Sequence, residues 1–267
     1  MLNAESCLLK AEIKMKNGHV THEISDNGIA TIEFGHPQSN SLPGAILEKL
    51  RKTITDIGAQ DNVKVIVLKS HGDRAFCGGA SFDELIAIND EKTGLEFFSG
   101  FANVINAIRK CPKLVIGRVH GKAVGGGVGI ASAVDYCFAT KFSAVKLSEL
   151  AVGIGPFVVG PAVQRKVGLS AFSHMTINAT EFMSAEWARE KGLFMEVHES
   201  AEEMDKSIQT LAEKLAGSNP EAMAKLKRVF WEGTETWDNL LKVRAQISGQ
   251  LVLSDFTKNA INSFKKK

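Results

Sequence analysis

Runs of apolar, strand-like residues alternate with helix-like segments through residue 150. Strands are predicted over residues 63–68, 114–119 and 136–139, with a further strand end over 144–147. Helices are predicted from Pro43, from about Phe82 and over residues 94–109, where apolar side chains recur on one face. A small-residue helix is expected over 130–134. This alternation predicts an α/β fold.

The two ends of the chain follow different patterns. Two β-rich runs, 19–24 and 29–34, flank Asp26-Asn27-Gly28, which favours a tight hairpin turn. After about Ser184 the pattern turns wholly helical, over 185–191, 201–216 and 220–231. We therefore expect an α/β core over residues 1–197 and a helical C-terminal region over 198–267.

Composition excludes several classes of protein. The chain has 267 residues, 44% of them hydrophobic, and a net charge of +2, which argues against disorder, nucleic-acid binding and anionic membranes. Neither a signal peptide nor a membrane-spanning run is visible, so a cytoplasmic location is expected. The four cysteines form no metal-ligand pattern and are expected to act as small, buried hydrophobic residues: Cys7, Cys77, Cys111 and Cys137. No metal and no cofactor is predicted.

Two glycine-rich segments, 75–81 and 120–129, follow strands and open helices. Such loops can direct backbone N–H groups at an anion or at developing negative charge. The segments match neither a P-loop nor a dinucleotide-binding G-x-G-x-x-G, and no G-x-S-x-G or H-E-x-x-H occurs. A nucleotide-binding function is therefore disfavoured. Close packing of helix on sheet is the alternative explanation for the glycines.

Glu149 is the one acid in a nearly apolar stretch, Leu147 to Pro156. Apolar surroundings disfavour the charged form of a carboxyl and raise its pKa towards neutrality, which suits a group that carries protons. The alternative is an acid at a strand end that points into solvent.

These segments together resemble the crotonase family, the enoyl-coenzyme A hydratases and isomerases. The resemblance covers nearly the whole chain and rests on five ordered matches: Asn40-Ser41-Leu42, 75–81, 120–127, 135–139, and Ser148-Glu149 with Gly153. It implies a spiral of ββα turns followed by a helical region that forms a homotrimer or homohexamer. It also implies an acyl-coenzyme A thioester as the substrate, with coenzyme A bound as part of it.

The resemblance assigns roles to single residues. Ala80 and Gly126 would donate backbone N–H groups to the thioester oxygen, and preorganised donors of this kind stabilise an enolate. Glu149 would carry the proton. Five residues would line the substrate site: Ser81, Phe82, Asp83, Gly127 and Gly129. We expect Gly126→Val to damage turnover far more than Gly121→Ala.

Two departures from the family pattern bear on the reaction. Gly129 stands where hydratases carry a first glutamate, and Ser81 replaces the usual aspartate. The run 153–159 is nearer to that of methylglutaconyl-type hydratases. Hydration of an α,β double bond is the first prediction, in which case the Gly129 side should leave room for a water. Isomerisation with the single Glu149 and non-catalytic binding of acyl-coenzyme A are the alternatives.

Overall fold

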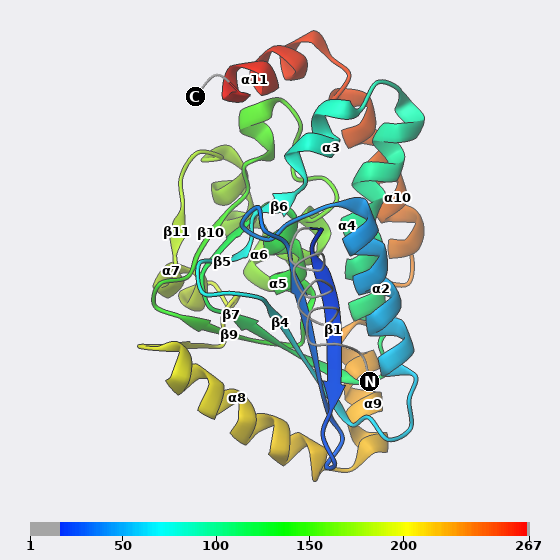
Figure 1. Ribbon diagram of the computed structural model, residues 1–267, viewed down its shortest axis with the longest axis vertical. Helices are drawn as coiled ribbons and strands as arrows, with labels where there is room; N and C mark the ends of the chain where they lie inside the picture. Colours follow the sequence, from blue (N-terminus) through cyan, green and yellow to red (C-terminus); the bar gives the residue numbers. More distant parts are fainter. Residues whose placement is uncertain (1–16, 266–267) are drawn as a thin grey trace, which may run out of the picture.

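The structure, a computed structural model, describes residues 17–265 and is built on a six-stranded sheet (Figure 1). The strand order is β1-β2-β4-β7-β9-β12, and only the β1–β2 pair is antiparallel. The strands are β1 (His19–Ile24), β2 (Ile29–Gly35), β4 (Val65–Ser70), β7 (Leu114–Val119), β9 (Tyr136–Thr140) and β12 (Glu196–His198). The predicted hairpin is thus confirmed as β1 and β2.

Two smaller sheets accompany the large one. One has the order β11-β10-β8-β5, and the other pairs β3 with β6. Their strands are short: β3 (Ser41–Leu42), β5 (Ala75–Cys77), β6 (Gly79–Ala80), β8 (Lys122–Val124), β10 (Ala144–Lys146) and β11 (Met183–Ser184). The two glycine-rich segments lie side by side in these sheets, because β5 of the first segment pairs in parallel with β8 of the second.

Helices connect the sheets in successive ββα turns. The chain runs β2, β3, α2 (Gly44–Gly58), then β4, β5, β6, α3 (Phe82–Ala87), α4 (Glu91–Lys110), then β7, β8, α5 (Gly126–Ala133), and then β9, β10, a 3₁₀ turn η1 (Glu149–Val152), α6 (Gly160–Ile177). Each turn places one strand in the large sheet and the next in a small one. The spiral of ββα units expected from the sequence is confirmed.

The later helices pack back on this core: α7 (Ala185–Glu190), α8 (Ala201–Ala216), α9 (Pro220–Phe230), α10 (Trp237–Leu251) and α11 (Asp255–Lys265). Helix α8 covers the outer face of the six-stranded sheet, where Met204 and Ile208 join a buried cluster with Val65 and Ile116. Helix α10 lies against α4. A side chain on Gly94 of α4 would come within 2.8 Å of Gly249 of α10, so both positions need glycine for this approach.

A buried ion pair fastens α9 to the large sheet. Lys227 Nζ lies 2.5 Å from Asp135 Oδ2, which also accepts the Val115 N–H at 2.7 Å. The Trp231 indole N–H donates to the other oxygen, Asp135 Oδ1, at 3.2 Å. Both charged side chains are at most 5% exposed. A buried charge of this kind is tolerated only with its partner in place.

Three sequence-based boundaries need correction. The small-residue helix α5 starts at Gly126, not at residue 130, because all eight of its residues are buried and no polar face marks its beginning. Strand β4 starts at Val65, two residues after the predicted start. Residues beyond 184 are not wholly helical, since β12 pairs in parallel with β9. The predicted domain boundary at 197/198 falls within β12, and the division stays a prediction.

Two further expectations can be compared with the described residues. Cys77, Cys111 and Cys137 are buried, as predicted, and form no disulfide, whereas Cys7 lies outside the described range. Within residues 17–265, no helix combines the length and the apolar character needed to cross a membrane.

Candidate active site

A cavity of about 620 Å³ opens between the ends of the short strands and the helices α3, α4 and α10. Its wall is mostly apolar, with aromatic side chains from α4 facing the glycine-rich segments. The wall residues used below are Ala80, Phe82, Leu85, Phe97, Phe98, Phe101, Gly125, Gly126, Lys146, Glu149, Val158 and Val159. Helix α11 packs on η1, so the C-terminal helix lies beside the segment that carries Glu149.

Glu149 brings the one carboxylate found among the described wall residues. It begins η1, three residues after β10 ends at Lys146, and its carboxylate packs on Gly125, where an added Cβ would lie 3.0 Å from Oε1. Although the residue as a whole is half-buried, Oε2 has no exposed surface and no hydrogen-bond partner among the described residues. Burial raises the pKa of Glu149 to about 7, against a smaller lowering by its own backbone N–H. The apolar setting inferred from the sequence is confirmed.

The start of α5 places a second group at the cavity. Gly125 has φ 51°, a conformation that favours glycine, and its N–H donates to the Lys146 carbonyl at 2.8 Å. Gly126 is the first residue of the helix, so its N–H has no carbonyl within the helix to bond. Gly126 therefore presents a backbone donor where a helix N-terminus meets the cavity.

The loop that carries Ala80 is held by a network around Asn40. The Asn40 amide donates to the carbonyls of His71 and Ala75 at 2.9 and 2.8 Å, which fixes the path of the chain into β5. Strand β6 is joined to β3 by the Ser81 N–H, which donates to the Leu42 carbonyl at 3.1 Å. This arrangement sets Ala80 in the wall of the cavity that Gly126 also lines.

Four of the eight residues predicted for the site line the cavity: Glu149, Ala80, Gly126 and Phe82. The other four do not reach its wall. Ser81 is buried and caps α3, and its Oγ accepts the Glu84 N–H. Asp83 is exposed and accepts a hydrogen bond from Gln38, while Gly127 is packed against Cys77. Their contact with a substrate stays a prediction.

The space beside Gly129 is closed. An added Cβ there would lie 2.6 Å from Val159 Cγ1 and 3.2 Å from Ile105 Cδ1. Apolar side chains thus occupy the position that the first atom of a side chain on residue 129 would need. The expectation that a hydratase would leave room for water beside Gly129 is not met.

Most of the apolar wall carries no signal in the sequence. The sequence predicts that Phe97, Phe98 and Phe101 lie in a helix, but nothing in their spacing distinguishes a cavity wall from a helix packed in the core. Ser248 on α10 reaches the wall from about 100 residues beyond Glu149. Only the fold brings these segments together.

The geometry can be compared with known proteins. A family model described as enoyl-CoA hydratase/isomerase matches residues 24–267. The chain belongs to the enoyl-CoA hydratase/isomerase family. It is therefore a member of an enzyme family whose hydratases and isomerases act on acyl-coenzyme A, and the resemblance inferred from the sequence is confirmed.

Relatives in this family carry different activities in their names. A Bacillus subtilis protein named "Probable enoyl-CoA hydratase" is 26% identical, over 91% of this chain and 94% of its own. A peroxisomal Δ(3,5)-Δ(2,4)-dienoyl-CoA isomerase of Arabidopsis thaliana is also 26% identical, over 93% and 94%. A mouse mitochondrial methylglutaconyl-CoA hydratase shares 26% over 85% and 73%.

Solved structures with a similar fold also include a protein named as an enoyl-CoA hydratase. The crystal structure of an enoyl-CoA hydratase from Bacillus halodurans superposes with a TM-score of 0.84 at 19% identity, over 91% of this chain and 99% of that one. At this identity the likeness establishes the fold, and the reaction has to be argued from the site.

Proposed function

We propose that this chain isomerises enoyl-coenzyme A esters, with Glu149 moving one proton between the α- and γ-carbons. The observation that carries the proposal is the pairing of a single carboxylate with a closed Gly129 side. Glu149 has a pKa of about 7, so near neutral pH it is ionised in part of the molecules and protonated in the rest. A group with that pKa can both take and return a proton.

The proposed reaction has two steps. Ionised Glu149 removes a proton from the α-carbon of a β,γ-enoyl ester, and the electron pair moves onto the thioester oxygen to give a dienolate. The N–H groups of Ala80 and Gly126 are the proposed donors to that oxygen, and one such donor typically contributes about 3–4 kcal/mol. Glu149 then returns the proton to the γ-carbon, which leaves the α,β-enoyl ester and regenerates the carboxylate.

The wall supports an acyl chain as the bound group. Phe97, Phe98 and Phe101 present aromatic surface on α4, and Leu85 and Val158 add aliphatic surface from α3 and the segment before α6. Apolar walls with few polar groups are typical of sites for apolar ligands. The length of the acyl chain would be set by these side chains.

Hydration of an α,β-enoyl ester is the second candidate. It is favoured by the hydratase names of relatives such as the Bacillus subtilis protein. In that reaction Glu149 alone would take a proton from water and deliver one to the α-carbon. With Val159 and Ile105 over Gly129, water would have to be held elsewhere in the cavity. A protein that only binds acyl-coenzyme A has less support, because a buried carboxylate without a partner costs stability and serves no purpose in binding alone.

We also propose a homotrimer, or a hexamer made of two trimers. Large apolar side chains that are more than half exposed in the single chain support this: Phe142, Leu169, Ile177, Val229 and Phe256. Sedimentation equilibrium on the purified protein tests the assembly, and a monomer at micromolar concentration would exclude it.

Product analysis tests the reaction. Purified protein is incubated in ¹⁸O-labelled water with a β,γ-enoyl ester and, separately, with the matching α,β-enoyl ester, and Glu149→Gln is run in parallel. We expect double-bond migration without a hydroxyacyl product, and a loss of about a hundredfold or more in Glu149→Gln. A labelled hydroxyacyl ester as the main product would replace isomerisation by hydration.

A further inference from the structure

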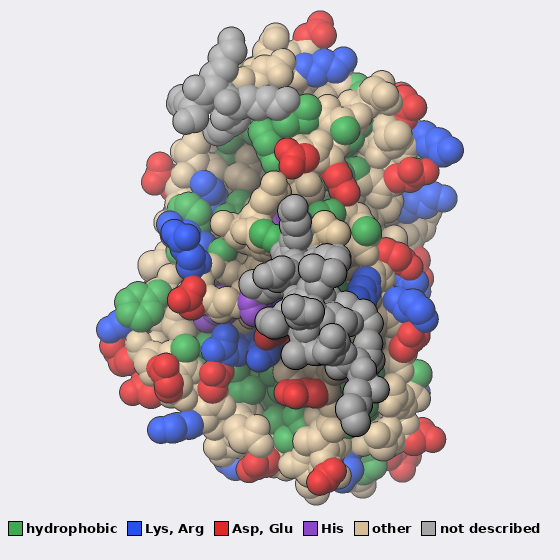
Figure 2. Space-filling model, viewed as in Figure 1, with side chains coloured by type: hydrophobic (Ala, Val, Ile, Leu, Met, Phe, Trp, Pro, Cys, Tyr) green, Lys and Arg blue, Asp and Glu red, His purple; other side chains and the backbone are tan. Residues whose placement is uncertain are grey.

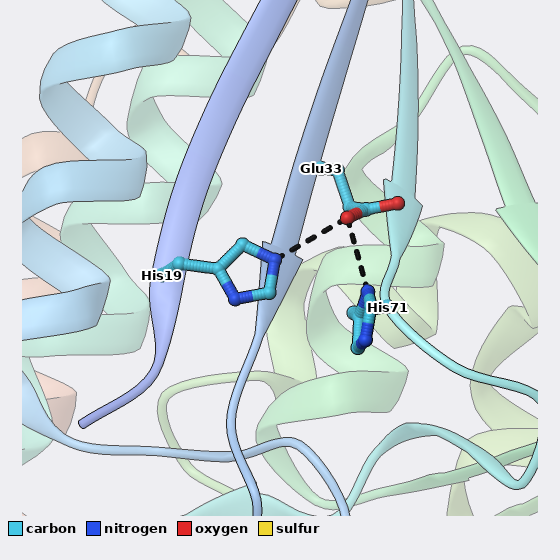
Figure 3. A group of neighbouring side chains, drawn as sticks. All are labelled: His19, Glu33 and His71. Atoms are coloured by element: carbon cyan, nitrogen blue, oxygen red, sulfur yellow. Dashed lines mark hydrogen bonds and ion pairs between the residues drawn. The ribbon is translucent and has the colours of Figure 1, made fainter. Parts of the chain in front are cut away.

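A second group of polar side chains lies outside the cavity, at one end of the large sheet. The side chains of His19, Glu33 and His71 converge there from β1, β2 and the residue just after β4 (Figure 3). His19 Nε2 is 3.3 Å and His71 Nδ1 is 3.2 Å from the same oxygen, Glu33 Oε1. Neither the proposed reaction nor the Asn40 network uses these three side chains.

The strand register explains the convergence. His19 pairs with Gly35 across β1 and β2, and Glu33 pairs with Lys69 across β2 and β4. Side chains two residues apart in a strand point to the same face, so His19, Glu33 and His71 share one face. Gly35 lies between them. An added Cβ there would come 2.6 Å from the His19 ring and 2.7 Å from His71 Cβ, so the absence of a side chain makes room for both rings.

We propose that His19, Glu33 and His71 form a binding site for a divalent transition-metal ion of the Zn²⁺ type. Two imidazoles and one carboxylate are a ligand set that zinc takes in proteins, with a fourth position left for water. Metal–ligand distances of about 2.0–2.2 Å in a tetrahedron set neighbouring ligand atoms about 3.3–3.6 Å apart. Two of the three separations in the cluster lie close to the lower end of that range, at 3.3 and 3.2 Å.

The third separation, between the two histidine nitrogens, is within 4.8 Å. The His71 side chain is 48% exposed and follows the end of β4, so its ring can rotate and bring its nitrogen closer to that of His19. His19 is buried and lies in strand β1, so its ring would stay in place. On the face shown in Figure 2, histidine side chains reach the surface near its middle, beside lysine or arginine side chains. A cavity of about 230 Å³ adjoins the cluster and would admit water as the fourth ligand.

The position of Lys69 determines which oxygen of Glu33 would bind the metal ion. Its Nζ lies 3.1 Å from Glu33 Oε2, while both histidines contact Oε1. The ammonium group can therefore stay on Oε2 and orient the carboxylate while Oε1 binds the metal, as outer partners of metal ligands commonly do. Burial alone would raise the pKa of Glu33, but its contacts with the two histidines and Lys69 lower the pKa below its ordinary value.

A metal ion at this site would stabilise the fold and would take no part in the proposed reaction. It joins β1, β2 and the loop that leads to Ala80, since the carbonyl of His71 is held by the Asn40 amide at 2.9 Å. A bound ion would thus fasten the start of the loop that carries one of the proposed oxyanion donors. Binding to the native state alone raises its stability in proportion to the logarithm of the metal concentration.

Titration of the full-length, tag-free protein with Co²⁺ and then Zn²⁺, after removal of metal with a chelator, tests the site. We expect one equivalent of Co²⁺ with the visible absorption of tetrahedral coordination, displacement by Zn²⁺, and a rise in the melting temperature. His71→Ala and Glu33→Gln should weaken binding about a hundredfold or more, given that even outer-shell changes cost 10–100-fold. His22→Ala, which changes an exposed histidine on the same strand β1, is the matched control and should bind as the unaltered chain does.

Circular dichroism establishes that each variant is folded. His71→Ala alters a half-exposed side chain, so it keeps the test valid if Glu33→Gln does not fold. Binding of Co²⁺ to His71→Ala with unchanged affinity, or no binding of one equivalent at about 100 µM metal, overturns the proposal. Because every readout is metal binding or melting, the result is independent of the proposed isomerase activity.

Discussion

Replacing Glu149 by glutamine should make the protein more stable in a way that depends on pH. Burial raises the pKa of Glu149 from 4.5 to about 7 in the folded state. Below about pH 4.5 both states hold the proton, so the stability contributed by the neutral, buried carboxyl is fully present. As pH rises towards 7, the unfolded chain loses the proton while the native protein keeps it, so the stabilising effect of the raised pKa disappears.

The size of the effect follows from the shift in pKa. At about 1.4 kcal/mol per pKa unit, the native protein loses about 3 kcal/mol between pH 4 and pH 8 because of this one group. Glutamine cannot ionise, so Glu149→Gln is spared this loss. Any fixed cost of burying the amide cancels when the two pH values are compared.

Urea unfolding followed by circular dichroism, at a series of pH values, measures the difference. The free energy of unfolding of Glu149→Gln minus that of the unaltered protein should increase by about 3 kcal/mol from about pH 4 to about pH 8. Glu232→Gln, at an exposed acid, serves as the control and should show no such trend. A difference that stays constant across this range would refute a buried, neutral Glu149.

Three further changes test the packing of the site and the core. Gly126→Ala should lower kcat/KM at least tenfold, because the new Cβ would lie 2.4 Å from the Phe101 ring. Gly217→Ala is the control, because its added Cβ would meet only carbonyl oxygens at 3.7 Å. Gly121→Ala cannot serve, since its Cβ would lie 2.1 Å from the Arg74 carbonyl oxygen. Gly129→Glu should lower the melting temperature without increasing hydration, and a gain in hydration at unchanged stability would contradict the closed Gly129 side. Lys227→Met should cost about 3–5 kcal/mol in urea unfolding, because it leaves Asp135 charged and buried; a loss under about 1 kcal/mol would show that the pair is not buried.

The sequence predicts those helices and strands that carry a strong local signal in their own residues. The β1–β2 hairpin and α4 have strong local signals, a turn at Asn27-Gly28 and an apolar face from Phe97 to Ile108, so their positions agree with the prediction. Helix α5 has no such signal because every side of it is buried, and β12 has three half-buried residues. Elements of this kind are defined by their neighbours rather than by their own residues.

The candidate site also contains some features that the sequence predicts and others that it does not. Glu149 was recognisable because it is a lone acid among apolar residues, and burial of its Oε2 follows from that setting. The filling of the Gly129 side by Val159 and Ile105 could not be predicted, since it depends on α4 and the start of α6 meeting α5. The His19–Glu33–His71 cluster was also missed, because 14 and 38 residues separate Glu33 from its two partners and only the sheet register joins them.

Exchange of the α-proton with solvent tests most directly whether Glu149 is the proton carrier. A β,γ-enoyl ester is incubated in D₂O from about pH 5 to about pH 9, and deuterium in substrate and product is followed by NMR. We expect kcat/KM for α-proton removal to fall about tenfold per pH unit below an apparent pKa near 7 and to level off above it, with exchange lost in Glu149→Gln. Exchange that is independent of pH across this range, or that persists in Glu149→Gln, would contradict this assignment.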